Sequence, residues 1–186
     1  MKMIDKFIIR PLNDTRFINT KEVNGKTMII NTSIEKAKDV NRIAEVIELP
    51  MDYDGNVRVG DHIVVHHNVF RDYFDGSGKT RESDHHIKDG FFYVQQELVY
   101  LILRGEQRIA VDNYCFIEPI ITDKKWVGKV EEEHIGIVKY SNKGLEKLGV
   151  RVGDKIVFHT NCEYLFEIDG LRLYRMRTHR ILAKLN

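Results

Sequence analysis

The stretch VRVGDHIVVH, at residues 57–66, returns as VRVGDKIVFH at residues 150–159, with eight of its ten positions identical. In both copies a Gly-Asp pair precedes a run of aliphatic or aromatic residues. Glycine reaches backbone angles closed to other residues, and aspartate can bond the backbone that it turns, so the pair predicts a tight turn. The run after the pair predicts a strand that enters a core. A turn-and-strand segment that occurs twice indicates an internally duplicated fold.

Weaker echoes extend the repeat along the chain. FIIRPL at residues 7–12 corresponds to CFIEPI at 115–120, and Asp89-Gly90 corresponds to Asp169-Gly170. Short runs rich in Val, Ile, Tyr and Phe lie between turn residues throughout, which predicts strands, and helical periodicity is weak. We therefore expect an all-β protein with a barrel or sandwich architecture.

The composition indicates a globular protein and argues against nucleic acid and membranes as partners. The chain has 186 residues, of which 42% are hydrophobic and 31% charged, as is typical of a globular protein rather than a disordered one. The 29 basic and 28 acidic residues leave a net charge of +1, so no overall field attracts nucleic acid or an anionic membrane. Apolar runs are far shorter than the roughly 20 residues of a membrane span. Cys115 and Cys162 form no CxxC motif, so we expect reduced thiols in a cytoplasmic protein.

At the repeated segments the chain resembles the GroES co-chaperonin family. GVRVGDKIVF at 149–158 is similar to the family's VKVGD motif and following strand, IRPLND at 9–14 to its opening segment, and ILA at 181–183 to its closing one. The resemblance implies two GroES-like β-barrel units in tandem, at about 1–104 and 105–186. It further implies a co-chaperonin that caps a GroEL-type chaperonin and assists ATP-dependent protein folding, with no enzymatic activity and no cofactor of its own. The family assembles as a homo-oligomeric ring, and a heptamer is favoured here.

In this family the loop after the first strand carries an aliphatic tripeptide that binds the chaperonin. The corresponding segment is the candidate mobile loop 20–39, and the candidate chaperonin-binding residues are Met28, Ile29 and Ile30, between polar flanks. An apolar trio in a polar loop suits a segment that folds on binding. From the residues alone, Thr27–Asn31 also matches a buried β-strand, and both interpretations stay open.

Three departures from the family pattern are visible. The second unit lacks a comparable loop, because residues 122–128 run directly into 129–133, so we expect no chaperonin anchor there. The segment that forms the roof hairpin in the family, 50–56, is short, and the first unit carries a hydrophilic insertion at 71–89 that we expect to be solvated and mobile. Together with the doubling, these features resemble divergent viral co-chaperonins, for which the compartment would be the host cytoplasm.

The sequence also contains residues that could serve a metal site, catalysis or nucleic-acid binding. The histidines His62, His66, His67, His85 and His86 raise a metal-site hypothesis, but no HExxH, CxxC or similar ligand spacing is present, so structural or solvated roles and no metal are expected. The sequence holds no GxSxG motif and no phosphate-binding glycine loop, so no catalytic residue is proposed. The basic residues of 172–180 alternate with apolar ones, which favours the charged face of a strand or a subunit contact over nucleic-acid binding. The alternative function is a non-catalytic structural or assembly protein, including a virion-associated one, that uses the barrel as an interaction module.

Overall fold

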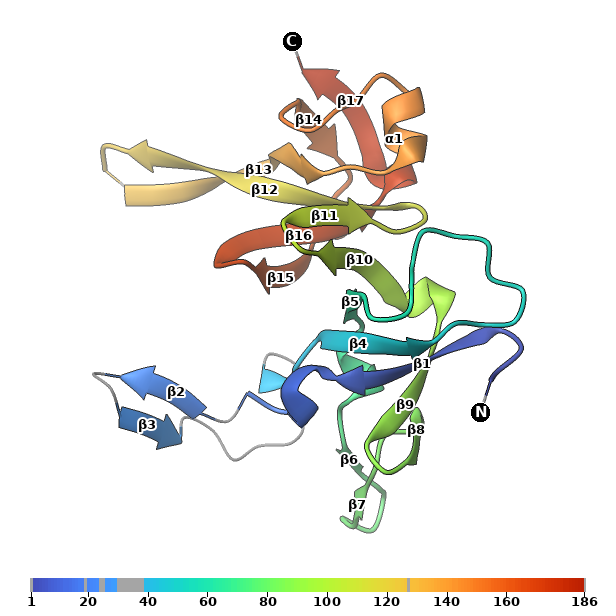
Figure 1. Cartoon of the computed structure of the whole chain (residues 1–186). Coiled ribbons are helices and arrows are strands. Elements are labelled where there is room, and N and C mark those ends of the chain that lie inside the picture. Colours follow the sequence, from blue (N-terminus) through green and yellow to red (C-terminus); the bar gives the residue numbers. More distant parts are fainter. Residues whose placement is uncertain (1, 19, 24–25, 30–38, 127, 186) are drawn as a thin grey trace. The chain divides into compact units, whose positions relative to one another are not determined.

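The computed structural model describes residues 2–18, 20–23, 26–29, 39–126 and 128–185. These residues form a mostly β protein with one short α-helix, α1 (Lys143–Lys147) (Figure 1). The chain divides into unit 1, Met1–Glu106, and unit 2, Gln107–Asn186. This boundary lies two residues from the expected seam.

In unit 1 the principal strands pair in the order β10-β5-β4-β1-β9-β8, and neighbouring strands are antiparallel. Their bounds are β1 (Lys6–Pro11), β4 (Ile43–Glu48), β5 (His62–Val65), β8 (His86–Lys88), β9 (Phe91–Gln95) and β10 (Val99–Arg104). Two further hairpins form separate two-stranded sheets, β2 (Thr20–Val23) with β3 (Lys26–Ile29) and β6 (Tyr73–Phe74) with β7 (Thr80–Arg81). The described residues of the unit also form the 3-10 turns η1 (Leu12–Asp14), η3 (His67–Val69) and η4 (Gln96–Leu98).

Unit 2 repeats this arrangement. Its strands pair in the order β17-β14-β13-β12-β16-β15, again antiparallel. If the six strands of each unit are numbered along the chain, both sheets have the same order, 6-3-2-1-5-4. The duplication seen in the sequence is therefore also a duplication of topology. The elements are β11 (Gln107–Ala110), β12 (Tyr114–Lys124), β13 (Gly128–Tyr140), β14 (Lys155–Phe158), β15 (Tyr164–Ile168), β16 (Leu171–Arg177), η5 (Thr178–Arg180) and β17 (Ile181–Leu185).

The Gly-Asp turns at 60–61 and 153–154 adopt the same hydrogen-bonded conformation. The two glycines have φ values of +83° and +90°, a region that residues with a Cβ rarely occupy. In each copy the aspartate carboxylate accepts the backbone N–H of the arginine three residues earlier, at 2.7 Å. Each glycine N–H also donates at 2.8 Å to the carbonyl of a valine on the neighbouring strand, Val46 or Val138. The repeated sequence therefore encodes the same local structure twice.

Each unit buries its own apolar core. In unit 1 the largest buried side chains are those of Phe7, Ile9, Ile63, Phe70, Phe92 and Tyr100, and the rings of Phe70 and Phe92 meet edge to face at 4.9 Å. In unit 2 a cluster is built from Cys115, Ile117, Val138, Leu145, Val150, Ile156, Phe158, Tyr174 and Met176. The repeat segments thus enter cores as the sequence predicts.

The expected closure of the sheets into barrels is not confirmed. Within the described residues β8 does not pair with β10 in unit 1, and β15 does not pair with β17 in unit 2, so neither set of six strands closes on itself. A closed barrel requires its first and last strands to hydrogen-bond with a consistent stagger. The three-residue β8, whose register shifts within its pairing to β9, offers little ladder for such closure.

Candidate functional site

The chain leaves the sheet of unit 1 between β1 and β4, and both ends of this excursion are joined at its base. The Ile18 N–H donates to the Asp39 carbonyl at 2.6 Å, and the Asn41 N–H donates to the Arg16 carbonyl at 2.8 Å. An isolated β-bridge links Phe17 to the buried Val40. The candidate loop 20–39 therefore begins and ends at one fixed point.

Two side chains hold this base against the sheet. The Asn41 amide donates to the Thr15 carbonyl at 2.6 Å, and its oxygen accepts the Ile43 N–H at 2.9 Å, at the start of β4. The Arg16 guanidinium donates to the Phe70 carbonyl at 3.0 Å and pairs with Asp72. A loop whose two ends are fixed in this way can project its middle without disturbing the core.

The middle of the excursion is the β2–β3 hairpin. Its strands pair in register from Thr20↔Ile29 to Val23↔Lys26, and within the described residues they pair only with each other. Such a two-stranded ribbon is at best marginally stable alone in water, because it has no buried face. Figure 1 shows the hairpin standing apart from the strands of the unit 1 sheet.

The structure places two of the three candidate residues on this hairpin and in solvent. The side chain of Met28 is 53% exposed and that of Ile29 is 74% exposed. Ile30 lies outside the described residues. Because successive side chains of a strand point to opposite faces, Met28 and Ile29 present apolar groups on both faces of the ribbon. The buried-strand interpretation is therefore wrong for these two residues: they do lie in a strand, but their side chains are exposed.

Asp75 organises a hairpin within the insertion 71–89. The carboxylate of Asp75 accepts the N–H groups of Ser77 and Lys79, each at 3.0 Å, and the Arg81 guanidinium at 2.9 Å, which closes the β6–β7 hairpin. The Ser77 hydroxyl, which donates to the same carboxylate at 2.6 Å, is the main reason why the pKa of Asp75 falls to about 2. Most of this segment is exposed, as expected, but Ser83 is buried.

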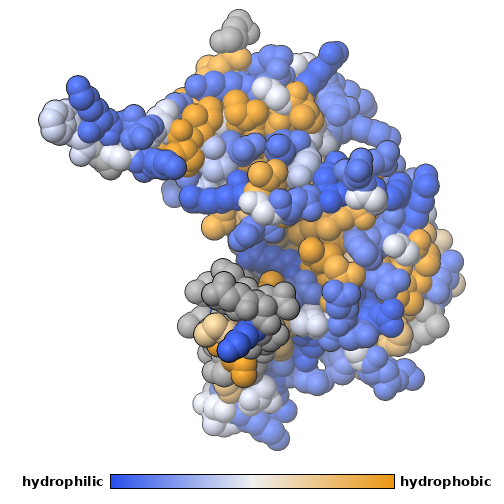
Figure 2. All heavy atoms as spheres, turned by 60° about the vertical axis from the view of Figure 1, so that its left-hand side comes forward, coloured by the Kyte–Doolittle hydropathy of each residue, from blue (hydrophilic) through white to orange (hydrophobic). Residues whose placement is uncertain are grey.

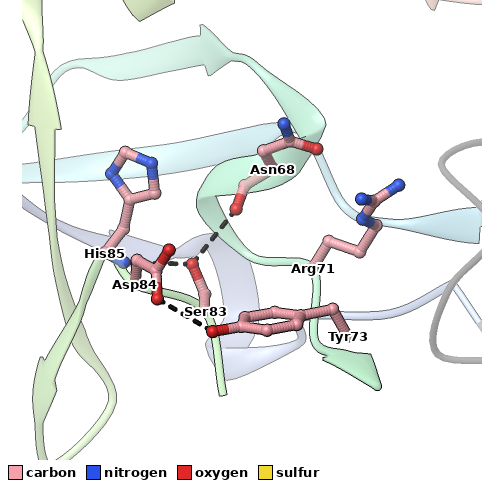
Figure 3. Close-up of a pocket in the computed structure, with 6 residues that line it drawn as sticks. All are labelled: Asn68, Arg71, Tyr73, Ser83, Asp84 and His85. Carbon is pink, nitrogen blue, oxygen red and sulfur yellow. Dashed lines mark hydrogen bonds between the residues drawn. The ribbon is translucent and has the colours of Figure 1, made fainter. Parts of the chain in front are cut away.

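A pocket of about 320 Å³ opens beside this insertion, lined by Asn68, Arg71, Tyr73, Ser83, Asp84 and His85 (Figure 3). The Ser83 hydroxyl donates to the Val69 carbonyl at 2.8 Å and to the Asn68 carbonyl at 3.1 Å. Its oxygen accepts a hydrogen bond from the backbone N–H of His85 at 3.2 Å. The Tyr73 hydroxyl donates to Asp84 at 3.1 Å. Ser83 is thus engaged on both its donor and its acceptor sides, so it is not a nucleophile activated by a neighbouring base.

Four of the histidines singled out in the sequence have structural partners, and two of them contact each other. The rings of His66 and His67 stack at 4.2 Å, and burial lowers the pKa of His67 to about 4. His85 Nδ1 lies 3.0 Å from the Tyr93 carbonyl, and burial lowers the pKa of His85. His86 pairs with Glu82 at 2.7 Å. Among the described residues no group of three His, Cys, Asp or Glu side chains could hold a metal ion.

The arginines of β16 lie against tyrosines rather than forming an open basic patch. Arg175 stacks over the rings of Tyr114 and Tyr164 at 5.0 and 4.9 Å, and Arg177 lies over the Tyr114 ring at 5.6 Å. Arg172 pairs with Glu131 at 3.3 Å. The stacking contacts join β16 to its neighbouring strands across one face of the sheet.

One exposed element escaped the sequence analysis. Residues 121–124 and 128–131, where the sequence predicts only a short connection, pair as the outer part of a long hairpin. Trp126, near its turn, is 92% exposed. The signal that could have revealed it is Gly128, whose φ of +80° suits the turn of a hairpin.

Comparison with known proteins gives no assignment: no family model matches this sequence, and no match is found among curated proteins. Within the described part of the chain, no helix combines the length and apolar character needed to cross a membrane.

Proposed function

We propose that this chain is a GroES-type co-chaperonin subunit, made of two GroES-like barrel units, that caps a GroEL-type chaperonin and assists ATP-dependent protein folding. It would act without catalysis, and the partner would hydrolyse ATP. The observation that carries the proposal is the exposure of Met28 and Ile29 on a separate hairpin whose ends are fixed to the sheet. The topological duplication supports the two-unit part of the proposal, together with the sequence motifs.

The energetics suit a reversible cap. Full burial of an aliphatic side chain contributes about 1.5–3 kcal/mol. Ordering the flexible segment that presents it offsets a large part of that gain. A single hairpin should therefore bind weakly. A ring that presents several hairpins at once gains affinity through effective concentration and can still be released when its partner changes state.

Ring assembly would also cover strands that end the sheets. Within the described residues β8 in unit 1 and β15 and β17 in unit 2 each have one strand neighbour, which leaves a row of backbone groups without a ladder partner. Identical contacts around a closed ring satisfy such edges in every subunit. A heptamer is favoured, since each chain then supplies one unit 1 hairpin to one of seven positions on the chaperonin.

The test is the triple variant Met28→Ser, Ile29→Ser, Ile30→Ser, assayed for capture by a chaperonin in the presence of ATP. Its matched control is Val59→Ser, which removes an aliphatic side chain of similar exposure, 59%, from the repeated turn. Capture should be lost in the triple variant alone, while native mass spectrometry shows the same oligomer for both variants and the wild type. Undiminished capture by the triple variant would refute the assignment of the anchor. A wild type that is monomeric at micromolar concentration would refute the ring.

A further inference from the structure

The β12–β13 hairpin of unit 2 extends well beyond its sheet. β16 pairs with β12 only as far as Ile117, and β14 pairs with β13 only over Ile135–Ile137. Beyond a register shift near Pro119, residues 121–124 pair with 128–131, and no third strand of the described residues joins them. We call this outer part, residues 121–131, the arm. It is visible as the long yellow hairpin in Figure 1, and its surface in Figure 2 is mainly hydrophilic with paler residues toward its end.

The arm occupies the same topological position as the β2–β3 hairpin. Each excursion connects the central strand of its unit to the neighbouring strand, β1 to β4 in unit 1 and β12 to β13 in unit 2. The proline at which each leaves the sheet is also equivalent: Pro11 pairs with Ala44, and Pro119 pairs with Gly136, two residues before the equivalent valines 46 and 138. The duplicated scaffold thus projects a hairpin from the same place twice.

Two ion pairs lie at the base of the arm. Glu131 pairs with Arg172 on β16 at 3.3 Å, and Glu132 pairs with Lys155 on β14 at 3.4 Å. All four side chains are partly exposed, so each pair stabilises the base only modestly. The pairs lie where the two-stranded part of the hairpin begins.

The end of the arm has the chemistry of a binding tip. Trp126 is 92% exposed, although tryptophan carries the largest apolar surface of any side chain and is among the residues most enriched at the energetic centres of interfaces. Around it lie Lys124, Lys125 and Lys129, all exposed, and within the described part of the chain none of the three forms an ion pair. An apolar pocket with an acidic rim is the surface that complements such a tip.

We propose that the arm is a second chaperonin-binding element, in which Trp126 enters an apolar pocket of the partner and the neighbouring lysines pair with carboxylates at its rim. This inference rests on the proposed function and extends it: each chain would contact the chaperonin through one hairpin per unit. The two contacts differ in chemistry, aliphatic in unit 1 and aromatic with basic flanks in unit 2. Linked sites of this kind reinforce one another through effective concentration.

Trp126 is the only tryptophan of the chain, so its fluorescence reports on the tip directly. The full-length protein is titrated with chaperonin in the presence of ATP, and the emission maximum and acrylamide quenching of Trp126 are followed. The Trp126→Phe variant supplies the background emission of the partner. Binding should shift the emission to shorter wavelength and reduce quenching several-fold, because the indole leaves water.

Capture assays on variants complete the test. Trp126→Ala and the charge reversal of Lys124, Lys125 and Lys129 to Glu should each weaken capture at least five-fold. The matched control Leu148→Ala, which removes another exposed apolar side chain of unit 2, should leave capture unchanged. Charge reversal should lose its effect at high salt, where attraction between exposed charges is screened.

The remaining outcomes separate the two proposals. If the chaperonin captures the wild type but acrylamide quenches Trp126 as strongly as in the free protein, this inference is overturned and the proposed function stands. No capture of the wild type would overturn both. Protection of Trp126 in the protein alone, increasing with concentration, would overturn the inference by showing that the tip contacts a second copy of this chain.

Discussion

The repeated Gly-Asp turn allows one substitution to be compared with its counterpart in the same molecule. Asp61 has a side chain that is 6% exposed, and it receives two hydrogen bonds from the Arg104 guanidinium, at 2.7 and 2.6 Å, besides the Arg58 N–H. Its counterpart Asp154 is 22% exposed and pairs with Lys184 through one contact at 2.7 Å. We predict that Asp61→Ala destabilises its unit more than Asp154→Ala does.

The loss of stability depends on how well the unpaired Arg104 or Lys184 can be hydrated after the aspartate is removed. Removing one partner of a buried ion pair costs about 3–5 kcal/mol, and a guanidinium that can still reach water recovers part of this. The side chain of Arg104 is 27% exposed, so we expect Asp61→Ala to cost about 2 kcal/mol, including the lost turn hydrogen bond. Lys184 is 40% exposed and rehydrates readily, so the loss at Asp154 should be smaller.

Amide hydrogen exchange with mass spectrometry measures each unit separately. A loss of about 2 kcal/mol corresponds to about 30-fold faster exchange, because each 1.4 kcal/mol is a factor of ten. The peptide 57–66 should accelerate by this factor in Asp61→Ala, and 150–159 should accelerate less in Asp154→Ala. Unchanged exchange of 57–66, or a larger effect in unit 2, would refute the reasoning.

The same pairs predict how stability depends on pH. Burial raises the pKa of the Asp61 carboxyl, but the hydrogen bonds from Arg104 and the Arg58 N–H lower it by more, so it lies below its ordinary value of 3.8. The hydrogen bond from Lys184 likewise lowers the pKa of Asp154. A lowered pKa in the folded state gives stability that is complete above the ordinary value and is lost as the pH falls through the folded value. Exchange in both repeat segments should therefore accelerate in acid relative to the intrinsic rate, and the alanine variants should show a weaker pH dependence.

Three further predictions concern single features. Burial raises the pKa of the Cys115 thiol to about 12, so iodoacetamide at pH 8 should modify the partly exposed Cys162 and leave Cys115 unmodified until the protein unfolds; equal rates would contradict its burial. At Gly136 a Cβ would lie 2.4 Å from an isoleucine methyl carbon, so alanine there should destabilise unit 2 by about 1–3 kcal/mol in urea unfolding. Alanine at Gly76, where a Cβ meets nothing within 4 Å, is the control and should have almost no effect. Limited trypsin digestion should cut the exposed segment 75–84 while both units stay folded, and resistance equal to that of the core strands would show that the segment is packed.

Strands that enter a core were predictable from the sequence, and the reason is burial. Runs such as those after the two Gly-Asp turns must be apolar to fill a core, and a turn with positive φ favours glycine, so both leave a visible pattern. Because the pattern occurs twice, the duplication could be read before any strand pairing was known. The near agreement of the expected seam with the boundary after Glu106 has the same origin.

The arm was missed because a two-stranded ribbon buries neither face. Residues 121–131 carry charged and polar side chains that a loop would also tolerate, and no core forces them to alternate. At Met28 and Ile29 the strand-like run left two interpretations open, a buried strand and an exposed anchor, and the exposure of both side chains excludes burial. Met28 and Ile29 show that strand propensity and burial are separate properties. Closure of the sheets depends on pairing between strands distant in sequence, which no single run encodes.

The two projecting hairpins carry an implication for how the duplicated chain diverged. The features that the two units share are those that a fold requires: the strand order, the Gly-Asp turns and the prolines at which the excursions leave the sheet. The excursions themselves share neither length nor composition. The base of the unit 1 excursion is joined by backbone hydrogen bonds, and ion pairs lie at the base of the arm. Exposed residues contribute little to stability, so such tips can change without cost to the scaffold. Both excursions nevertheless carry large exposed apolar side chains, Met28 and Ile29 in β3 of one and Trp126 near the turn of the other. Contact with a partner is the role that we propose for these apolar groups, and the capture assays on the two hairpins test it.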